Sequence, residues 1–466
     1  MDKDIDNNMA EPLNILTKEM RENANLADIN EYIKHGGYQA LEKALKSMTS
    51  EALIDEIKNS GIKGRGGAGF STGMKWSLCG DRMPRYLCTN GDESEPGSFK
   101  DRLLLEGNPH RVIEGMIITC FAMGINLGYI YIRGEFFQII EQMESAFNQA
   151  REKGFLGKDI LGTGFDLDLY AHPGAGAYIC GEETGLIESL EGNRPYPRLK
   201  PPFFPAAIGL WGQPTIVNNV ETMAQVTIIV GMGAEAYKQI GSEEDTTGPR
   251  LFGLCGHVKN PGAYEFDSTI TLKELIYDVA GGIRDDNKIK GVIPGGISAP
   301  ILTPEEINTP MGFGALGKLG SMGGTGGIIV MDEKTSMIDT LLNASSFARH
   351  ESCGQCTPCR EGVPWMNDII RRIKHGDGRE EDIDLLLDIC KQIHGHTVCV
   401  FGQAPGVWPV RTMLIKYWPE FRACIEQKKQ VVLPVEESYL KPHQYEHIPP
   451  VPGNFRMVTE EADAAG

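Results

Sequence analysis

Four cysteines constrain the fold of this chain more than any other feature of its sequence. Cys353, Cys356 and Cys359 form one CxxCxxC run, and Cys399 follows later in the segment HTVCVFG. Four thiolates are the ligand set of a [4Fe–4S] cluster, so the fold must bring the two segments together. A zinc site normally uses two CxxC pairs, and four unrelated buried thiols would leave the spacing unexplained. The spacing therefore favours an iron–sulfur cluster, with zinc as the alternative.

The cysteines fall between predicted helices. Apolar residues recur at steps of three and four in 336–349, 362–374, 379–393 and 407–428. Four helices of this length predict a bundle over residues 333–429. The CxxCxxC run lies between the first two helices and Cys399 between the last two, so both segments are expected at one end of the bundle.

The rest of the chain divides into further units, because 466 residues are too many for a single core. In 61–245, strands at 85–90 and 128–133 alternate with helices at 110–123 and 136–153, which predicts an α/β domain with a parallel sheet. Residues 246–332 predict a small α+β module with strands at 250–257, 291–293 and 327–331 and a helix at 272–280. Its glycine-rich stretch 312–327 predicts turns without a helix. We also expect a helical lead-in at 1–60, with helical periodicity at 32–45 and 51–57, and an extended proline-rich tail at 430–466.

Composition excludes some classes of function. The net charge of −18 repels nucleic-acid phosphates and anionic lipid headgroups. The uncharged stretch 115–132 is interrupted by turn residues, which predicts a buried helix and a strand rather than a membrane span. The start has no basic-then-apolar signal pattern, and 11 cysteines indicate a reducing compartment.

Residues 64–69 fit the GxGxxG pattern of dinucleotide-binding loops. A standard fingerprint follows a strand, whereas 51–60 is predicted to be a helix, so Rossmann geometry is not expected at this loop. Glycines still let backbone amides approach a phosphate, and Arg65 and Lys75 can supply countercharge. The alternative is a glycine turn with solvated basic neighbours.

Three further polar segments are candidates for ligand binding. Asp92, Glu93 and Glu95 follow the predicted strand 85–90, where open α/β sheets bind ligands, although a solvated acidic turn would look the same. The second is the acidic run 178–184, and the third is 214–222, where two asparagines and a threonine precede a helix. Neither of these two is specific by itself.

The motifs GRGGAGFSTGMKW, NGDESEPGSFKDR, AGAYICGEETGLIESLEG, PTIVNNVET and ESCGQCTPCREG occur in this order. With them, over residues 60 to 425, the chain resembles the NADH-binding flavoprotein subunit of respiratory complex I. The resemblance implies a Rossmann-like flavin and NADH domain, a β-grasp-like module and a four-helix bundle with a [4Fe–4S] cluster. The same core occurs in diaphorase subunits of NAD-linked hydrogenases and formate dehydrogenases, which is the alternative in the same class. A zinc-stabilised interaction module without redox activity is the alternative in a different class.

The resemblance also implies the reaction and the site residues. NADH gives a hydride to FMN, and electrons then pass singly to the cluster on Cys353, Cys356, Cys359 and Cys399. The FMN residues it implies are Gly64, Arg65, Gly66, Gly67, Ala68, Gly69, Lys75, Asn90, Asp92, Glu93, Ser94, Tyr178, Gly181, Glu182, Glu183, Asn218, Asn219 and Thr222. The NADH contacts it implies are Phe70, Glu95, Glu183, Phe203 and Phe204. Of these, Glu95 and Glu183 are the residues expected to matter most in catalysis, and their charge should favour NADH over NADPH.

The expected partners follow from the same resemblance. They are a thioredoxin-like [2Fe–2S] protein and a large multi-cluster iron–sulfur protein, through which electrons reach quinone. We expect a peripheral component on the cytoplasmic side of the bacterial inner membrane. Neither nucleic-acid binding nor direct membrane insertion is expected.

Overall fold

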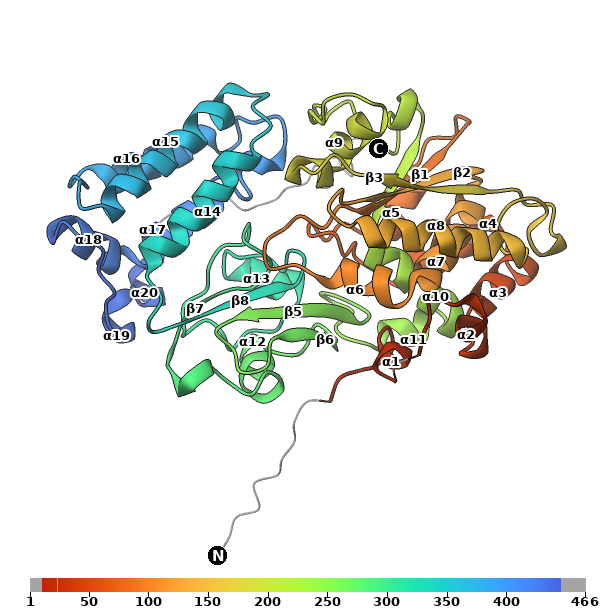
Figure 1. Cartoon of the computed structure of the whole chain (residues 1–466), viewed down its shortest axis with the longest axis horizontal. Coiled ribbons are helices and arrows are strands. Elements are labelled where there is room, and N and C mark those ends of the chain that lie inside the picture. Colours follow the sequence, from red (N-terminus) through yellow and green to blue (C-terminus); the bar gives the residue numbers. More distant parts are fainter. Residues whose placement is uncertain (1–10, 23, 446–466) are drawn as a thin grey trace, which may run out of the picture.

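The computed structural model describes residues 11–22 and 24–445, and it contains two four-stranded sheets and a helical region (Figure 1). The first sheet has the strand order β3-β2-β1-β4, and the second has the order β6-β5-β8-β7. Helices α14 to α18 form a separate layer beside the second sheet (Figure 1). The α/β class expected from the sequence is confirmed.

The first sheet is entirely parallel. Its strands are β1 (Tyr86–Gly91), β2 (Leu127–Ile132), β3 (Asp168–Pro173) and β4 (Thr215–Asn219). The covering helices include α6 (Lys100–Gly107), α7 (Pro109–Met123), α8 (Phe137–Glu152) and α10 (Val220–Met232). From β1 the chain continues to β2 and β3 on one side of β1, and it then crosses back to form β4 on the other side. The strand order therefore reverses at β1. Ligands bind at such a switch point, outside the carboxyl ends of the strands.

The stretch 115–132 is buried inside this domain, as the sequence predicts. It forms the larger part of α7 and all of β2. Within the described residues, no helix is both long and apolar enough to cross a membrane.

The N-terminal segment packs into the same domain. It forms α1 (Lys18–Arg21), α2 (Ile29–Lys34), α3 (Gln39–Ser47) and α4 (Ser50–Asn59). The continuous helical periodicity predicted for 32–45 is wrong, because a turn at 35–38 separates α2 from α3. Apolar side chains of these helices belong to the core beneath the first sheet. Residues 1–10 of the predicted lead-in lie outside the described residues.

The second sheet is mixed. Its strands are β5 (Arg250–Gly256), β6 (Gly262–Phe266), β7 (Ile289–Ile293) and β8 (Gly327–Asp332), with β5 and β8 parallel. The predicted helix 272–280 starts as α12 (Leu272–Glu274) and continues as a π-helical turn, Leu275–Val279. The glycine-rich stretch contains a short helix that was not expected, α13 (Phe313–Lys318). Asp245 holds its start by accepting hydrogen bonds from the amides of Gly314 and Ala315.

The C-terminal helices differ from the prediction at three points, the first being that the helix expected at 379–393 begins three residues later, at Asp382. They are α14 (Met337–Glu351), α15 (Thr357–Lys374), α16 (Asp382–Ile393), α17 (Trp408–Lys416) and α18 (Trp418–Glu426). Helix α15 begins five residues earlier than expected, with a proline in its first turn. The fourth predicted helix is two helices, because Pro419 lacks the N–H that would continue α17.

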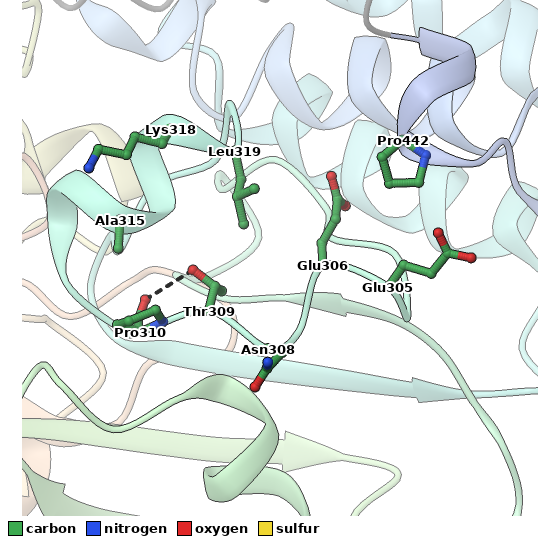
Figure 2. Close-up of a pocket in the computed structure, with 9 residues that line it drawn as sticks. All are labelled: Glu305, Glu306, Asn308, Thr309, Pro310, Ala315, Lys318, Leu319 and Pro442. Atoms are coloured by element: carbon green, nitrogen blue, oxygen red, sulfur yellow. Dashed lines mark hydrogen bonds between the residues drawn. The ribbon is translucent and has the colours of Figure 1, made fainter.

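Part of the proline-rich tail packs against the protein. It forms α19 (Val435–Ser438) and α20 (Pro442–Tyr445), and Val435, Ser438 and Tyr439 are buried. Figure 2 shows Pro442 beside Glu305 and Glu306, at a cavity of about 540 Å³ that α13 also lines. The extended conformation expected for 430–466 is therefore wrong for these two helices. Residues 446–466 lie outside the described residues.

Several shorter segments connect the main elements. They are α5 (Thr72–Ser77), α9 (Glu183–Leu190), α11 (Ala234–Lys238) and the 3₁₀ turns Tyr178–Gly181 and Val400–Gly402. Further 3₁₀ turns lie at Ile160–Gly162, Leu210–Gly212 and Arg284–Asp286. The turns at 178–181 and 400–402 bear on the site described next.

Candidate flavin and iron–sulfur site

The predicted ligand segments meet at the switch point of the first sheet. Asn90 at the end of β1 is paired in register with Asn219 at the end of β4. The side-chain amide nitrogen of Asn90 donates to the carbonyl of Gly181, 2.8 Å away, which ties the 178–184 segment to the sheet. Three of the motifs that are distant in sequence are thus neighbours.

The glycine loop lies against the same strand end. The Arg65 amide donates to the Thr222 hydroxyl at 3.0 Å, and a Cβ on Gly66 would lie 3.3 Å from the Cβ of Asn219. The loop is preceded by α4 and followed by α5, so it does not have the strand-then-helix setting of the dinucleotide fingerprint. This agrees with the sequence analysis. The backbone of 64–69 borders the switch point without a Rossmann turn.

The two predicted countercharges have different positions. The Arg65 guanidinium is fully buried and donates to the carbonyls of Thr247 and Pro249, so it stabilises the protein interior. Lys75 is partly exposed, donates to the Val217 carbonyl at 3.0 Å and lies 3.6 Å from Glu183. Of the two, only Lys75 presents its charge at the surface of the site.

The carboxylates of the acidic turn have separate surroundings. Glu93 accepts the backbone amides of Lys100, Asp101 and Arg102, and thereby caps the start of α6. Asp92 accepts from the Ser94 hydroxyl through one oxygen, while its other oxygen is buried without a partner among the described residues. Burial raises the pKa of Asp92 to about 7. A buried, unsatisfied acceptor at the switch point fits a bound group that supplies an N–H, as a flavin ring does.

Glu95 is held by two elements from different parts of the chain. Its Oε2 accepts from the Tyr178 hydroxyl at 2.6 Å, and its Oε1 accepts from the Ser298 amide at 2.7 Å. Burial raises the pKa of Glu95, and the hydrogen bonds from Ser298 and Tyr178 oppose that rise. Sequence reasoning missed Ser298, because nothing near it in sequence carries a recognisable motif.

A lysine that sequence reasoning missed joins the second acidic pair. Lys200 lies 2.8 Å from both Glu182 and Glu183. Burial alone would raise the pKa of Glu183, but Lys75 and Lys200 outweigh it and hold that pKa below its ordinary value. Glu182 also caps α9 through the amides of Thr184 and Gly185. In the sequence, Lys200 could have been singled out by its position directly before two prolines and two phenylalanines.

The aromatic residues predicted to contact NADH are partly exposed. Phe203 is 39% and Phe204 43% exposed, and Phe70 is half-buried. Exposed aromatic rings a few residues from the Lys200 ion pairs offer stacking area to a nicotinamide or an adenine.

The four cysteines gather at one end of the helical layer. Cys356 is the N-cap residue of α15, Cys359 lies in its first turn, and Cys399 precedes the 400–402 turn. Burial, with a smaller contribution from the charge of a Cys353 thiolate, raises the pKa of Cys359 to about 11 and that of Cys399 to about 12. Among the described residues, no three His, Cys, Asp or Glu side chains converge closely enough to hold one metal ion. The cysteines are close enough to influence one another electrostatically, and in a [4Fe–4S] cluster each thiolate binds a different iron.

The segment Tyr178–Glu182 lies between the switch point and the cysteines. The Tyr178 ring centroid is 5.7 Å from that of Phe401, which stands two residues after Cys399, while its hydroxyl binds Glu95. Burial is the main cause of the raised pKa values of Cys353 and Cys399, and the Glu182 carboxylate adds to both. One short segment therefore contacts both halves of the site.

Comparison with known proteins agrees with this geometry. A family described as "Nuo51 FMN-binding domain" matches residues 57–228, and one described as "NADH-ubiquinone oxidoreductase-F iron-sulfur binding region" matches 339–424. A third, "SLBB domain", matches 250–330. The chain is 46% identical over 403 residues to an F subunit (the second of that name) of NADH-quinone oxidoreductase from Rhizobium meliloti, covering 86% of this chain and 95% of that protein. The chain belongs to the family of NADH-quinone oxidoreductase F subunits.

Other family members are similarly related. The F subunit of NADH-quinone oxidoreductase from Escherichia coli is 44% identical over 421 residues, covering 88% of this chain and 93% of that protein. Among solved structures, an NAD+-reducing [NiFe]-hydrogenase in the H2-reduced state matches with a TM-score of 0.74 and 33% identity. That match covers 84% of this chain and 65% of the hydrogenase chain. The predicted family, FMN and [4Fe–4S] cluster are confirmed, and the family match favours iron–sulfur over the zinc alternative.

Proposed function

We propose that this chain oxidises NADH at the switch point and passes the electrons to a cluster held by Cys353, Cys356, Cys359 and Cys399. Bound FMN supplies the chemistry, since it takes two electrons as a hydride and releases them singly. The observation that best supports this proposal is the position of the 178–182 segment, which contacts Glu95 on one side and Phe401 on the other. This segment keeps the flavin site and the cluster close together.

The residues proposed to hold FMN act in three ways. Backbone amides of the glycine loop approach the phosphate, and Lys75 neutralises it. Asn90, Asp92 and Asn219 border the ring, and the unsatisfied oxygen of Asp92 accepts a ring N–H. Arg65, Glu93 and Thr222 support these groups from the interior, because their side chains bind the protein's own backbone.

NADH is proposed to lie over the flavin face between the exposed aromatics and the acidic residues. Phe70, Phe203 and Phe204 offer ring surface, and Glu95 borders the nicotinamide half. Glu183, whose side chain is 28% exposed, is proposed to lie toward the adenosine half, where its negative charge opposes the 2′-phosphate of NADPH, so NADH is the preferred donor. The protein's part in the hydride transfer is to hold two rings face to face and to exclude water.

Electrons are proposed to leave at the cysteine end of the helical layer. Val400, next to Cys399, is 44% exposed there and offers apolar surface to another protein. We propose a thioredoxin-like [2Fe–2S] protein and a larger multi-cluster protein as partners, with quinone as the final acceptor. The chain would then be a peripheral component on the cytoplasmic side of the bacterial inner membrane.

The hydrogenase similarity supports a second candidate function, the diaphorase component of a hydrogenase. Identifying the polypeptides that purify with this chain would distinguish the two candidates.

The binding site is tested by replacing Lys75 with alanine. Without its charge, the FMN retained per chain should fall about fivefold or more, measured by flavin fluorescence after acid release. NADH-dependent ferricyanide reduction should fall in proportion and return when FMN is added in excess. The control is Lys158→Ala, which removes an 82% exposed lysine paired with Asp166. Equal FMN content in both variants would contradict the proposed site.

A further inference from the structure

Two consecutive residues of the 178–182 segment belong to different hydrophobic cores. Ile179 is 3% exposed and packs in the core that the helical layer forms, together with side chains of α14 and α15. Cys180 is fully buried in a separate core on one face of the first sheet, with Cys88 of β1 and Tyr131 of β2. Because neighbouring side chains are fixed in both cores, this segment joins the helical layer to the first sheet.

The end of α14 holds Tyr178 by its backbone and by its ring. The Tyr178 amide donates to the Glu351 Oε2 at 3.0 Å. The Phe347 ring, one helical turn before Glu351, meets the Tyr178 ring edge to face, with 5.2 Å between the centroids. The Glu351 side chain is 19% exposed, and its Oε1 lies 3.2 Å from the Nδ1 of His350. The Glu351 carboxylate therefore connects the helical layer to the backbone of Tyr178.

The same segment borders the unsatisfied oxygen of Asp92. A Cβ on Gly181 would lie 3.6 Å from the Asp92 Oδ2, and the Gly181 carbonyl accepts from the Asn90 side chain at 2.8 Å. Burial is the main cause of the raised pKa of Asp92, and the carboxylates of Glu135 and Glu351 add to it. The position of the segment therefore determines the space beside the oxygen that is proposed to accept a flavin N–H.

We infer that Glu351 is a positioning residue that couples the two cofactor sites, because it holds the 178–182 segment against the helical layer in the position that FMN requires. The inference rests on the proposed function, in which Asp92 and its neighbours border the flavin ring. Cys353 stands two residues after Glu351, so the helix end that leads into the cysteine run also fixes one side of the flavin pocket.

The direction of the effect follows from these contacts. Without the Glu351 carboxylate, the Tyr178 amide loses its acceptor and the segment gains conformations that FMN does not bind. The apparent affinity for FMN falls, because only part of the population is then competent to bind. The coupling is reciprocal, so FMN that orders the segment also orders the end of α14 and the cysteine run.

The test compares variants of the full chain that keep their cluster and are titrated with FMN. Glu351→Ala removes the acceptor, whereas Glu351→Gln keeps an oxygen at the same place. Glu426→Ala is the control, because it removes a glutamate of the same layer that is 58% exposed and paired with Arg422. The measured quantities are the Kd for FMN by flavin fluorescence, hydrogen exchange with and without FMN, and the electron paramagnetic resonance signal of the reduced cluster.

Glu351→Ala should raise the Kd for FMN about tenfold, the loss expected for one hydrogen bond to a charged group. Its cluster signal should stay, since the four cysteines are unchanged. Glu351→Gln should stay within about threefold of the wild-type Kd, and Glu426→Ala should equal it. In the wild type, FMN should slow hydrogen exchange in residues 347–356, and this protection should be largely lost in Glu351→Ala.

Equal Kd values for Glu351→Ala and Glu426→Ala would overturn the role of Glu351, as would the absence of FMN-dependent protection at 347–356 in the wild type. If Glu351→Ala loses its cluster or does not fold, Ile179→Ala removes the packing of the same segment in the helical core. That variant should raise the Kd for FMN, and an unchanged Kd would equally overturn the coupling. A failure of the proposed function is distinct, because the wild-type chain supplied with FMN would then not oxidise NADH.

Discussion

At the scale of single residues, eleven cysteines are chemically alike in the sequence but not in the structure. Cys390 is fully buried on α16 against Met366, and burial raises the pKa of Cys390 to about 12. Cys399 lies half-buried beside the 400–402 turn, within electrostatic reach of Cys353 and Cys359. The difference in position separates a packing thiol from a proposed cluster ligand.

Replacing Cys399 with alanine should therefore abolish the electron paramagnetic resonance signal of the reduced [4Fe–4S] cluster. Three thiolates cannot hold the cubane firmly, so iron per chain should fall as well. Cys390→Ala should keep the full signal and cost about 1 kcal/mol of stability. The reverse pattern would contradict the ligand assignment.

At the scale of elements, the start of α6 depends on a residue outside the helix. Its N-cap residue, Phe99, offers no side-chain acceptor, and Glu93 accepts three backbone amides of the first turn instead. A carboxylate at a helix N-terminus also interacts favourably with the helix dipole. Glu93 therefore joins β1, the acidic turn and α6 into one rigid unit.

Glu93→Gln should weaken the first turn of α6 by about 1–3 kcal/mol, because one neutral oxygen replaces two charged ones. Hydrogen exchange measured by mass spectrometry should show faster exchange in residues 100–104. The control is Glu106→Gln at the other end of α6, where an exposed pair with Arg102 contributes little. Equal exchange in the two variants would mean that Glu93 does not cap the helix.

At the scale of the whole molecule, buried ion pairs join the second sheet to the helical layer. Lys290 lies 2.6 Å from Glu420, and Lys416 lies 2.8 Å from Glu306, with all four side chains at most 7% exposed. The tail closes over the second pair, since the Tyr445 hydroxyl donates to Glu306 at 2.8 Å. The Leu440 amide also donates to the Lys416 carbonyl at 2.7 Å.

Ending the chain after residue 429 should therefore lower the midpoint of heat inactivation by about 5–10 °C. The truncation admits water to the Lys416 and Glu306 pair and removes the packing of Val435 and Tyr439. Ending it after residue 445 keeps all these contacts and should leave the midpoint within about 2 °C of the full chain. Equal midpoints for both truncations would show that 430–445 does not hold the two parts together.

The sequence by itself determined the cofactors, the family and most of the regular elements. Residue chemistry and short spacings are local properties, so the cysteine run, the acidic turn and the strands β1 and β2 could be located directly. The strands β3, β4 and β6 were missed, since their segments include residue types that are depleted in strands: an aspartate and a proline in β3, two asparagines in β4 and a glycine in β6. Two helix breaks were also missed, at 35–38 and at Pro419, because the apolar periodicity continues across the turn and the proline.

Only the tertiary structure decided which polar partner each site residue takes. Arg65 and Glu93 were predicted to face the cofactor, yet their side chains bind backbone groups inside the protein. Glu95 and Ser298 are separated by 203 residues, and no local pattern links them. A buried polar group must find a partner wherever the fold brings one within hydrogen-bonding distance. That choice depends on how the two sheets and the helical layer pack, and packing is a property of the whole chain.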